Sequence, residues 1–153
     1  MALKWLIATA TQGSADAFVE NEFQTGLSNV TRTAFRIRRI EWGLPLLIGA
    51  DCSFLVQLGR NSQAAITTTL GNPVINTVFR SMELTTSGMV VQDNSPWIAY
   101  ARDEELLIVE ESLFLRLDST GTSASNSCAC RIGYEQRTIT ENERLSIQAA
   151  TSS

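Results

Sequence analysis

Apolar and polar residues alternate along much of this chain with a period of two, not with the 3.6-residue period of a helix. In each of the segments Phe54–Leu58, Leu113–Leu117 and Cys128–Tyr134, every second residue counted from the first is apolar. Because successive side chains of a strand point to opposite faces, this alternation places one face in a core and the other toward solvent. The pattern predicts short, half-buried strands.

Turn signals rich in Gly, Ser, Asn and Pro separate the strand-like segments. The predicted strands are Lys4–Thr11, Asp16–Gly26, Arg32–Trp42, Cys52–Leu58, Gly88–Gln92, Trp97–Ala101, Glu105–Val109, Ser112–Asp118 and Ser127–Thr138. Many short strands in one chain are typical of a β-sandwich, a jelly roll or a barrel. We expect an all-β fold, a single jelly roll or β-sandwich of about eight strands with one or two short helices.

A first helix is predicted after Asn72 and Pro73, because asparagine is a good N-cap and proline suits the first helical position. From there to Met82, apolar residues recur at helical spacing. We expect a short helix over Pro73–Glu83 that lies over one of the sheets.

The end of the chain carries a second helical signal. Thr140-Glu-Asn-Glu143 matches a capping box, which predicts a short helix through Ile147. The small, polar residues Ala149–Ser153 are expected to form a surface extension. At the other end, we expect Met1–Gln12 to be a first strand or an ordered arm. No internal repeat or linker divides the chain, so residues 1–153 are predicted to form a single domain.

The stretch FRIRRIEW in the third predicted strand could bind nucleic acid through its arginines or could be a half-buried strand. Phe35 and Ile37 share one strand face, but Ile40 and Trp42 are out of phase with them. A β-bulge near Arg38–Arg39 would bring all four apolar side chains to one face. We therefore expect the arginines on the exposed face, in salt bridges at the surface or between subunits.

The net charge and the length of the chain do not favour binding to nucleic acid or to a membrane. The chain has 153 residues, with 12 Lys and Arg against 16 Asp and Glu, so its formal net charge is −4. Phosphate backbones are bound through clustered positive charge, so there is no strong nucleic-acid signal. The first 30 residues contain one positive side chain, Lys4, and thus no basic arm. No apolar run is long enough to span a bilayer.

The sequence contains no histidine. Histidine is the commonest general acid–base group and metal ligand, and it activates serine and cysteine nucleophiles. Acidic pairs such as Glu110-Glu111 fit solvated turns better than a glycosidase pair, because adjacent strand residues face opposite ways. We expect no catalytic, cofactor-binding or metal-binding residues, and we expect that the protein is not an enzyme.

Three cysteines are present, Cys52, Cys128 and Cys130. Cys128 and Cys130 are two apart on a strand, so they point to the same face and are poorly placed to bridge each other. A metal or redox site is one interpretation. We favour the other, two small buried hydrophobic residues, because free cysteine is usually buried. No disulfide framework is implied.

Tryptophan and arginine are enriched at the centres of protein interfaces. Candidate subunit contacts are therefore the three tryptophans, one tyrosine and two arginines of the exposed strand face. For each tryptophan, core packing is the alternative. The candidates are Trp5, Arg36, Arg38, Trp42, Trp97 and Tyr100. Trp97 follows a polar turn and Pro96, so it is the tryptophan expected nearest to a surface loop.

The layout of the chain is similar to that of a known class of proteins. DAFVENEFQTGLS leads into TAFRIRRIEWGL, and FLVQLGRNSQAAI leads into GNPVINTVFRSM. The second half, LLIVEESLFLRLDSTGTSASNSCACRIGYEQRTITENERL, joins two strands through a Ser/Thr/Gly/Asn hairpin and ends in an acidic cap. Over about residues 15–147, this order resembles the small single jelly-roll coat proteins of icosahedral viruses, especially prokaryote-infecting or uncultured ones.

The resemblance implies a structural virion protein. It would assemble in the host cytoplasm, with other copies of itself and with other virion proteins, into an icosahedral shell. Because the basic arm of many RNA-virus coats is missing, genome neutralisation would fall to another protein, an internal membrane layer or polyamines. Two alternatives stay open: a carbohydrate- or receptor-binding β-sandwich module, for which Trp42, Trp97 and Tyr100 would supply aromatic surface, and a capsid decoration or cement protein.

Overall fold

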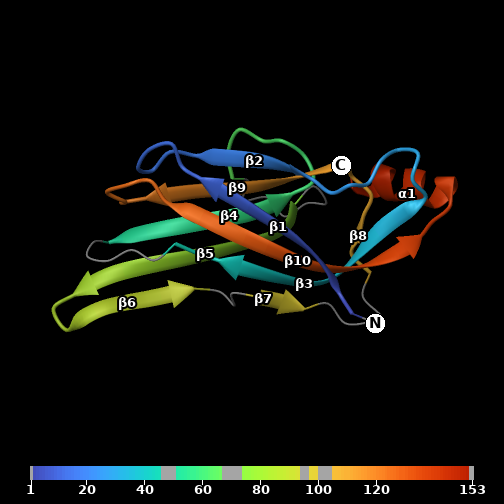
Figure 1. Ribbon diagram of the computed structural model, residues 1–153. Coiled ribbons are helices and arrows are strands. Elements are labelled where there is room, and N and C mark those ends of the chain that lie inside the picture. The colour runs from blue at the N-terminus through green and yellow to red at the C-terminus, as the bar shows by residue number, and fades with distance from the viewer. Residues whose placement is uncertain (1, 46–50, 67–73, 94–96, 100–104, 152–153) are drawn as a thin grey trace.

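The structure is a computed structural model, and it describes residues 2–45, 51–66, 74–93, 97–99 and 105–151. Within these residues it contains ten strands and one helix (Figure 1). The elements are β1 Lys4–Thr11, β2 Val19–Gln24, β3 Thr33–Gly43, β4 Cys52–Gly59, β5 Val74–Thr85, β6 Gly88–Asp93, β7 Trp97–Ala99, β8 Leu107–Ile108, β9 Ser112–Thr120, β10 Ser127–Thr138 and α1 Glu141–Thr151.

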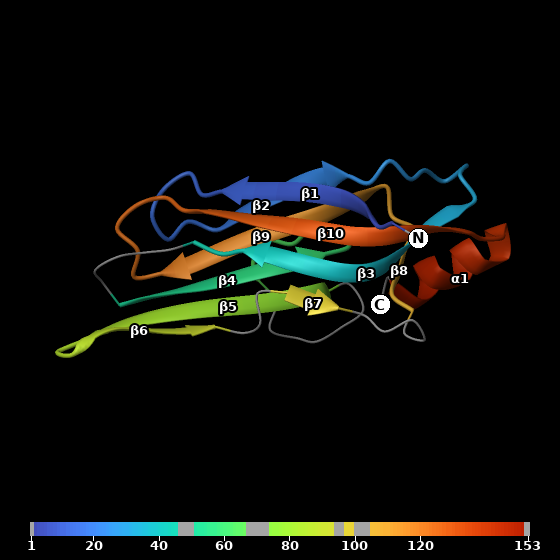
Figure 2. The same ribbon diagram turned by 60° about the horizontal axis from the view of Figure 1, so that its bottom comes forward.

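The strands form two antiparallel sheets that pack against each other (Figure 1, Figure 2). Sheet A has the order β1-β10-β3-β7, and β8 pairs with another part of β3. Sheet B has the order β2-β9-β4-β5-β6. The N-terminal segment is therefore a paired strand, the first of the two forms expected for it.

The pairing order identifies the topology. β1 pairs with β10, β2 with β9, β3 with β7 and β8, and β4 with β5. The outermost strands of the sequence thus pair first, and successive pairs alternate between the two sheets. This nested arrangement is a jelly roll. The expected all-β jelly-roll sandwich is confirmed, and β6 widens sheet B by one further strand.

The hydrophobic core lies between the sheets and is built from the alternating positions. Phe54 and Val56 of β4 and Leu117 of β9 have no exposed surface. Full burial of such a side chain contributes about 1.5–3 kcal/mol. The smaller Ala8 and Ala10 supply the core face of β1. The apolar residues that alternate along the sequence are therefore the ones that lie on the buried face of each strand.

The bulge predicted in FRIRRIEW is present in β3. Gly133 of β10 lies opposite Arg39, whereas its neighbour Tyr134 lies opposite Ile37, so Arg38 is the extra residue. As a result, Ile37 and Ile40 are only 2% and 0% exposed on the same core face. The prediction is confirmed, and the arginines between them are directed away from the core.

The helix expected over Pro73–Glu83 is wrong, because Val74–Thr85 forms the strand β5. Asn72 and Pro73, its expected cap, lie outside the described residues. Val78 and Met82 are both buried in the core. Their spacing of four residues fits one face of a helix and also one face of a strand, so it could not decide between them. The β-branched residues at the start of the segment favour the strand.

The second predicted helix is confirmed as α1. The backbone N–H of Glu143 donates to Thr140 Oγ1 at 3.2 Å, and the backbone N–H of Thr140 donates to Glu143 Oε2 at 2.7 Å. These are the two bonds of a capping box. The helix continues to Thr151, so Ala149–Thr151 are helical and not the expected extension, while residues 152–153 lie outside the description.

α1 covers a second, smaller apolar cluster beside the main core. Ile147 packs against Ala34, Val109 and Ile139 there. The helix has 11 residues. In the described part of the chain, no helix has both the length and the apolar character needed to cross a membrane.

Candidate functional site

The two predicted interface arginines lie on the outer face of sheet A and form ion pairs within the chain. Arg36 Nη2 lies 2.6 Å from Glu105 Oε1, and Arg38 Nε lies 3.1 Å from Glu135 Oε2. Their side chains are 25% and 11% exposed. The sequence left surface and intersubunit salt bridges open, and the structure shows surface ones.

The ion pairs continue along β3 and β10. Arg131 Nε donates to Glu41 Oε2 at 2.7 Å, and Glu41 Oε1 also lies 2.8 Å from Arg39 Nε. Arg137 Nη1 lies 2.9 Å from Glu105 Oε2. Guanidinium and carboxylate groups therefore alternate over this face. Such alternation differs from the clustered positive charge that phosphate backbones bind.

Trp5 is a partly exposed aromatic on the same face. A Cβ placed on Gly133 would lie 3.0 Å from two carbons of the Trp5 ring, so the indole lies directly over this glycine. The guanidinium carbon of Arg131 lies 4.4 Å from the ring centre, a cation–π contact. A sugar could stack on that side of the ring only by displacing Arg131. Trp5 is 38% exposed and is available to a protein partner.

The other aromatic candidates differ in position. Trp42 lies in the main core and is 7% exposed, which leaves almost none of its surface for a partner. Trp97 pairs with Glu41 as part of β7, but its side chain lies outside the described part. Tyr100 also lies outside the described residues. The structure thus brings Trp5, Arg36 and Arg38 onto one face of sheet A.

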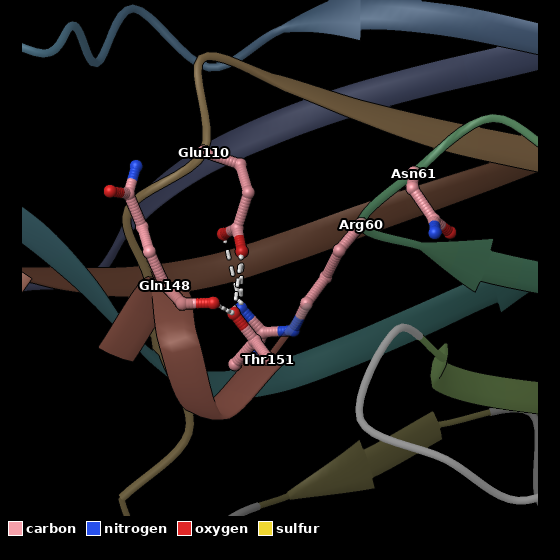
Figure 3. Close-up of a pocket in the computed structure, with 5 residues that line it drawn as sticks. All are labelled: Arg60, Asn61, Glu110, Gln148 and Thr151. Carbon is pink, nitrogen blue, oxygen red and sulfur yellow. Dashed lines mark hydrogen bonds and ion pairs between the residues drawn. The ribbon is translucent and has the colours of Figure 1, made fainter. Parts of the chain in front are cut away.

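A pocket of about 290 Å³ lies where the end of β4 meets α1 (Figure 3). Its lining residues are Arg60, Asn61, Glu110, Gln148 and Thr151. Arg60 Nη1 lies 3.0 Å from both carboxylate oxygens of Glu110. The hydroxyl of Thr151 donates to Glu110 at 3.3 Å.

The charged groups of this pocket are already engaged with each other. The Arg60 side chain is 6% exposed and also donates to the backbone carbonyl of Leu107 at 3.0 Å. Glu110 additionally accepts from the backbone N–H of Val109 at 3.0 Å. The cluster therefore joins the end of β4 to the β8–β9 connection and to α1. We interpret it as a structural tie.

A row of polar side chains crosses the outer face of sheet B in register. Glu20, Arg116, Gln57 and Thr77 lie opposite one another on four successive strands. Arg116 Nε donates to Glu20 at 2.7 Å, and Arg116 Nη1 donates to Gln57 at 3.0 Å. Gln57 Nε2 then donates to Thr77 at 2.9 Å. The row links β2, β9, β4 and β5 through their side chains.

The segment after β4 folds over the part of this row that contains Arg116 and Glu20. The backbone carbonyl of Asn61 accepts a hydrogen bond from Arg116 Nη2, and the backbone N–H of Gln63 donates to Glu20 at 2.9 Å. Arg116 is consequently 0% exposed although it points away from the main core. Each guanidinium nitrogen has a partner, which is what makes such deep burial tolerable.

The carboxyl of Glu20 has a pKa below its ordinary value. Burial by itself would raise the pKa. Hydrogen bonds from the Ser62 hydroxyl, the Gln63 backbone and Arg116, together with the Arg116 charge, outweigh the effect of burial. The ionised carboxylate is thus the form that the fold stabilises.

The lowered pKa of Glu20 predicts an acid-sensitive contribution to stability. Because the folded pKa lies below the unfolded one, the stabilisation is present above about pH 4.3 and is lost as the pH falls through the folded pKa. We expect the free energy of unfolding of the wild type to fall more steeply below pH 5 than that of Glu20→Gln. Urea denaturation at several pH values measures this. Glu22→Gln, at an exposed site, is the control, and parallel curves for wild type and Glu20→Gln would contradict the prediction.

The β5–β6 hairpin exposes much apolar surface. Of the ten large apolar side chains that are exposed in the described part of the chain, five lie on this hairpin. They are Phe79, Leu84, Met89, Val90 and Val91. Their exposed fractions range from 42% to 55%. We call Leu84, Met89, Val90 and Val91 the apolar ribbon.

Three of these residues extend the core face of sheet B beyond the core itself. Val91 lies opposite the buried Met82, and Leu84, on the same face of β5, lies opposite Met89. Both views show the tip of the hairpin projecting past the other strands (Figure 1, Figure 2). Leu84 is therefore 55% exposed although it continues a buried row. The fourth residue, Val90, faces the opposite side, so both sides of the hairpin are apolar.

Cys128 and Cys130 are buried, as the sequence predicted. Cys52, Cys128 and Cys130 are free and buried. Burial raises the pKa of the Cys128 thiol to about 12, which keeps it protonated and unreactive. Among the residues that the structure describes, no group of His, Cys, Asp and Glu could hold a metal ion.

Comparison with known proteins adds no family. No protein-family model matches the chain, and no curated protein matches it significantly. The resemblance to small jelly-roll coat proteins is therefore still a prediction from the layout of the sequence.

The apolar ribbon was missed at the level of sequence, because β5 was predicted as a helix. Without β5 there is no hairpin for Gly88–Asp93 to complete. A signal was present: Thr86-Ser87 is a two-residue turn between two strand-like runs, and the following Gly88 has a positive φ of 135°. The exposure of the ribbon, in contrast, depends on where sheet A ends.

Proposed function

We propose that this protein is a structural subunit that assembles with copies of itself into a closed shell, as the coat proteins of icosahedral viruses do. One observation carries the proposal: Leu84, Met89 and Val91 of the apolar ribbon extend the core face of sheet B outside the sandwich. A solitary subunit leaves this surface in water, whereas an assembled subunit covers it.

The energetics favour assembly at this place. Burial of apolar surface contributes about 25 cal/mol per Å². Contiguous exposed apolar surface on a soluble protein marks a contact site or an aggregation hazard. A closed shell repeats the same modest contacts between many pairs of subunits, so no single interface has to be strong. Leu84, Met89 and Val91 supply such a repeated contact.

The outer face of sheet A offers a second contact surface. Ile7 is 69% exposed and lies near Trp5 on β1. The alternating charges around Arg131 and Glu41 would favour a partner face of complementary charge order and would reject others. Under this proposal the partners are other copies of the chain and other virion proteins, the location is the virion, and no residue has a catalytic role.

The mass of the purified protein tests the proposal. Light scattering after size exclusion, with negative-stain images, should show rings or shells far larger than the 16.8 kDa chain. The double variant Met89→Lys and Val91→Lys should stay small, because lysine on the ribbon opposes burial. Val30→Lys is the matched control, since Val30 is an isolated apolar residue that is 89% exposed. It should assemble like the wild type.

A wild type that stays monomeric at high concentration and at every salt concentration would contradict the proposal. Glycan arrays would then test the binding-module alternative, and addition to preformed capsids would test the cement alternative. Charged ribbon variants that assemble as well as the wild type would show that the contact lies elsewhere on the subunit.

A further inference from the structure

We infer that β6 pairs in antiparallel orientation with β6 of a second copy, around a two-fold axis that passes beside Val90. The contact joins the two five-stranded B sheets into one continuous sheet. This inference rests on the proposed function, because it specifies the partner and geometry of one contact in the shell.

The free edge of β6 is the first observation. Among the strands that the structure describes, β6 is the last of sheet B and is paired with β5 alone. Every second residue of such an edge strand turns its backbone N–H and C=O groups outward. These groups pair with water in a solitary subunit and would pair with a strand in an assembled one. A strand is therefore the kind of partner that this edge fits.

The composition of β6 itself is the second observation. Natural edge strands are guarded by charges, by proline or by a covering segment. The edge strand β2 carries Glu20 and Glu22, and the edge strand β1 begins at Lys4. Asn21 also covers β1 by donating to the Thr9 carbonyl at 2.6 Å. β6 reads Gly-Met-Val-Val-Gln-Asp, with no lysine, arginine or proline and one charge at its end.

Symmetry selects the register. A two-fold axis perpendicular to a sheet keeps every side chain on its own face, so one residue must lie opposite its own copy. If that residue is Val90, Met89 of each copy lies opposite Val91 of the other. Moving the axis to Val91 would instead place Met89 opposite Asp93. The Val90 register matches apolar residues with apolar residues and sets no like charges opposite each other.

The same symmetry explains why a second copy is the occupant. With the axis at Val90, Leu84, Met89 and Val91 of both copies fall on one face and form a single apolar surface. Stable protein interfaces bury at least about 1,200 Å² of accessible surface, and the pairing of two short strands buries less than this. The contact is therefore weak alone and is expected to be populated mainly within an assembly that other contacts support.

Disulfide trapping tests the register. In Val90→Cys the two introduced thiols lie opposite each other, with Cα atoms about 4.5–5.5 Å apart, within the range of a disulfide. In the matched variant Val91→Cys the two Cα atoms are diagonal neighbours about 7–8 Å apart, beyond that range. The sites are almost equally exposed, at 45% and 43%. The native cysteines are buried, so the wild type gives the background.

Mild oxidation should give at least about tenfold more disulfide-linked dimer for Val90→Cys than for Val91→Cys. The reason is that only the two Val90 Cα atoms lie close enough for a disulfide to join them. Normal assembly of both variants with no dimer from Val90→Cys would overturn the inference and leave the shell proposal standing. Equal dimer from both would also overturn it, because random collision does not distinguish the two sites. If the wild type itself never assembles and neither variant forms dimer, both proposals fail.

Discussion

Arg116→Met is expected to lower the free energy of unfolding by about 3 kcal/mol, because removal of one partner from a buried polar cluster leaves the other polar groups buried without a hydrogen-bond partner. Arg116 has no exposed surface and donates to Glu20, Gln57 and the Asn61 backbone. Methionine fills a similar length but offers no donor. The carboxylate of Glu20, 15% exposed, would lose its counter-charge.

Urea denaturation of the purified variant measures this loss. Arg39→Met is the matched control: Arg39 also pairs with a glutamate, Glu41, but its side chain is 43% exposed. Exposed ion pairs contribute about 0–1 kcal/mol, so the control should stay close to the wild type. If the two variants lose similar amounts of unfolding free energy, the burial of Arg116 is not the cause of the destabilisation.

Gly121→Ala should destabilise the fold by about 2–3 kcal/mol, through backbone strain and a collision. Gly121 follows β9 with a φ of 77°, a left-handed conformation that alanine avoids. A Cβ at this position would collide with the carbonyl oxygen of Asp51. The turn cannot easily move away, since Asp16 accepts from the backbone N–H groups of Gly121 at 3.1 Å and of Thr122 at 3.0 Å.

Thermal and urea unfolding of Gly121→Ala check this second prediction. Gly13→Ala serves as the control, because an added Cβ there meets nothing within 4 Å. Its stability should change by less than about 1 kcal/mol. A mild effect of Gly121→Ala, no larger than that of the control, would show that the turn can rearrange around the added methyl group.

Most strands could be predicted from the sequence because burial in a sandwich alternates with each residue. Ser127–Thr138 and Lys4–Thr11 were predicted with the bounds that the structure gives. The prediction for β5 was wrong because its buried residues, Val78 and Met82, are four apart, a spacing that fits one face of a helix and also one face of a strand. The bulge in β3 could be predicted because Ile37 and Ile40 are three residues apart, and in a strand only a bulge puts two such residues on one face.

The candidate surfaces were only partly predictable. The outward position of Arg36 and Arg38 followed from strand phase, which is local information. Arg116 has the same local pattern, between buried leucines on β9, yet it is fully buried. Its burial comes from the segment after β4 folding across the sheet, and no alternation within β9 can encode that. The exposure of the apolar ribbon is equally non-local.

The nested strand order has a consequence for the order in which the chain can fold. Lys4 pairs with Tyr134, so the first strand stays without its partner until nearly all of the chain has emerged from the ribosome. Contacts this distant in sequence are slow to form. During that interval β4, β5 and β6 can pair locally and present their apolar hairpin before the sandwich closes. Nascent chains are thus most vulnerable to premature association during synthesis, and the rate of translation and the supply of chaperones are expected to affect the yield of correctly folded protein.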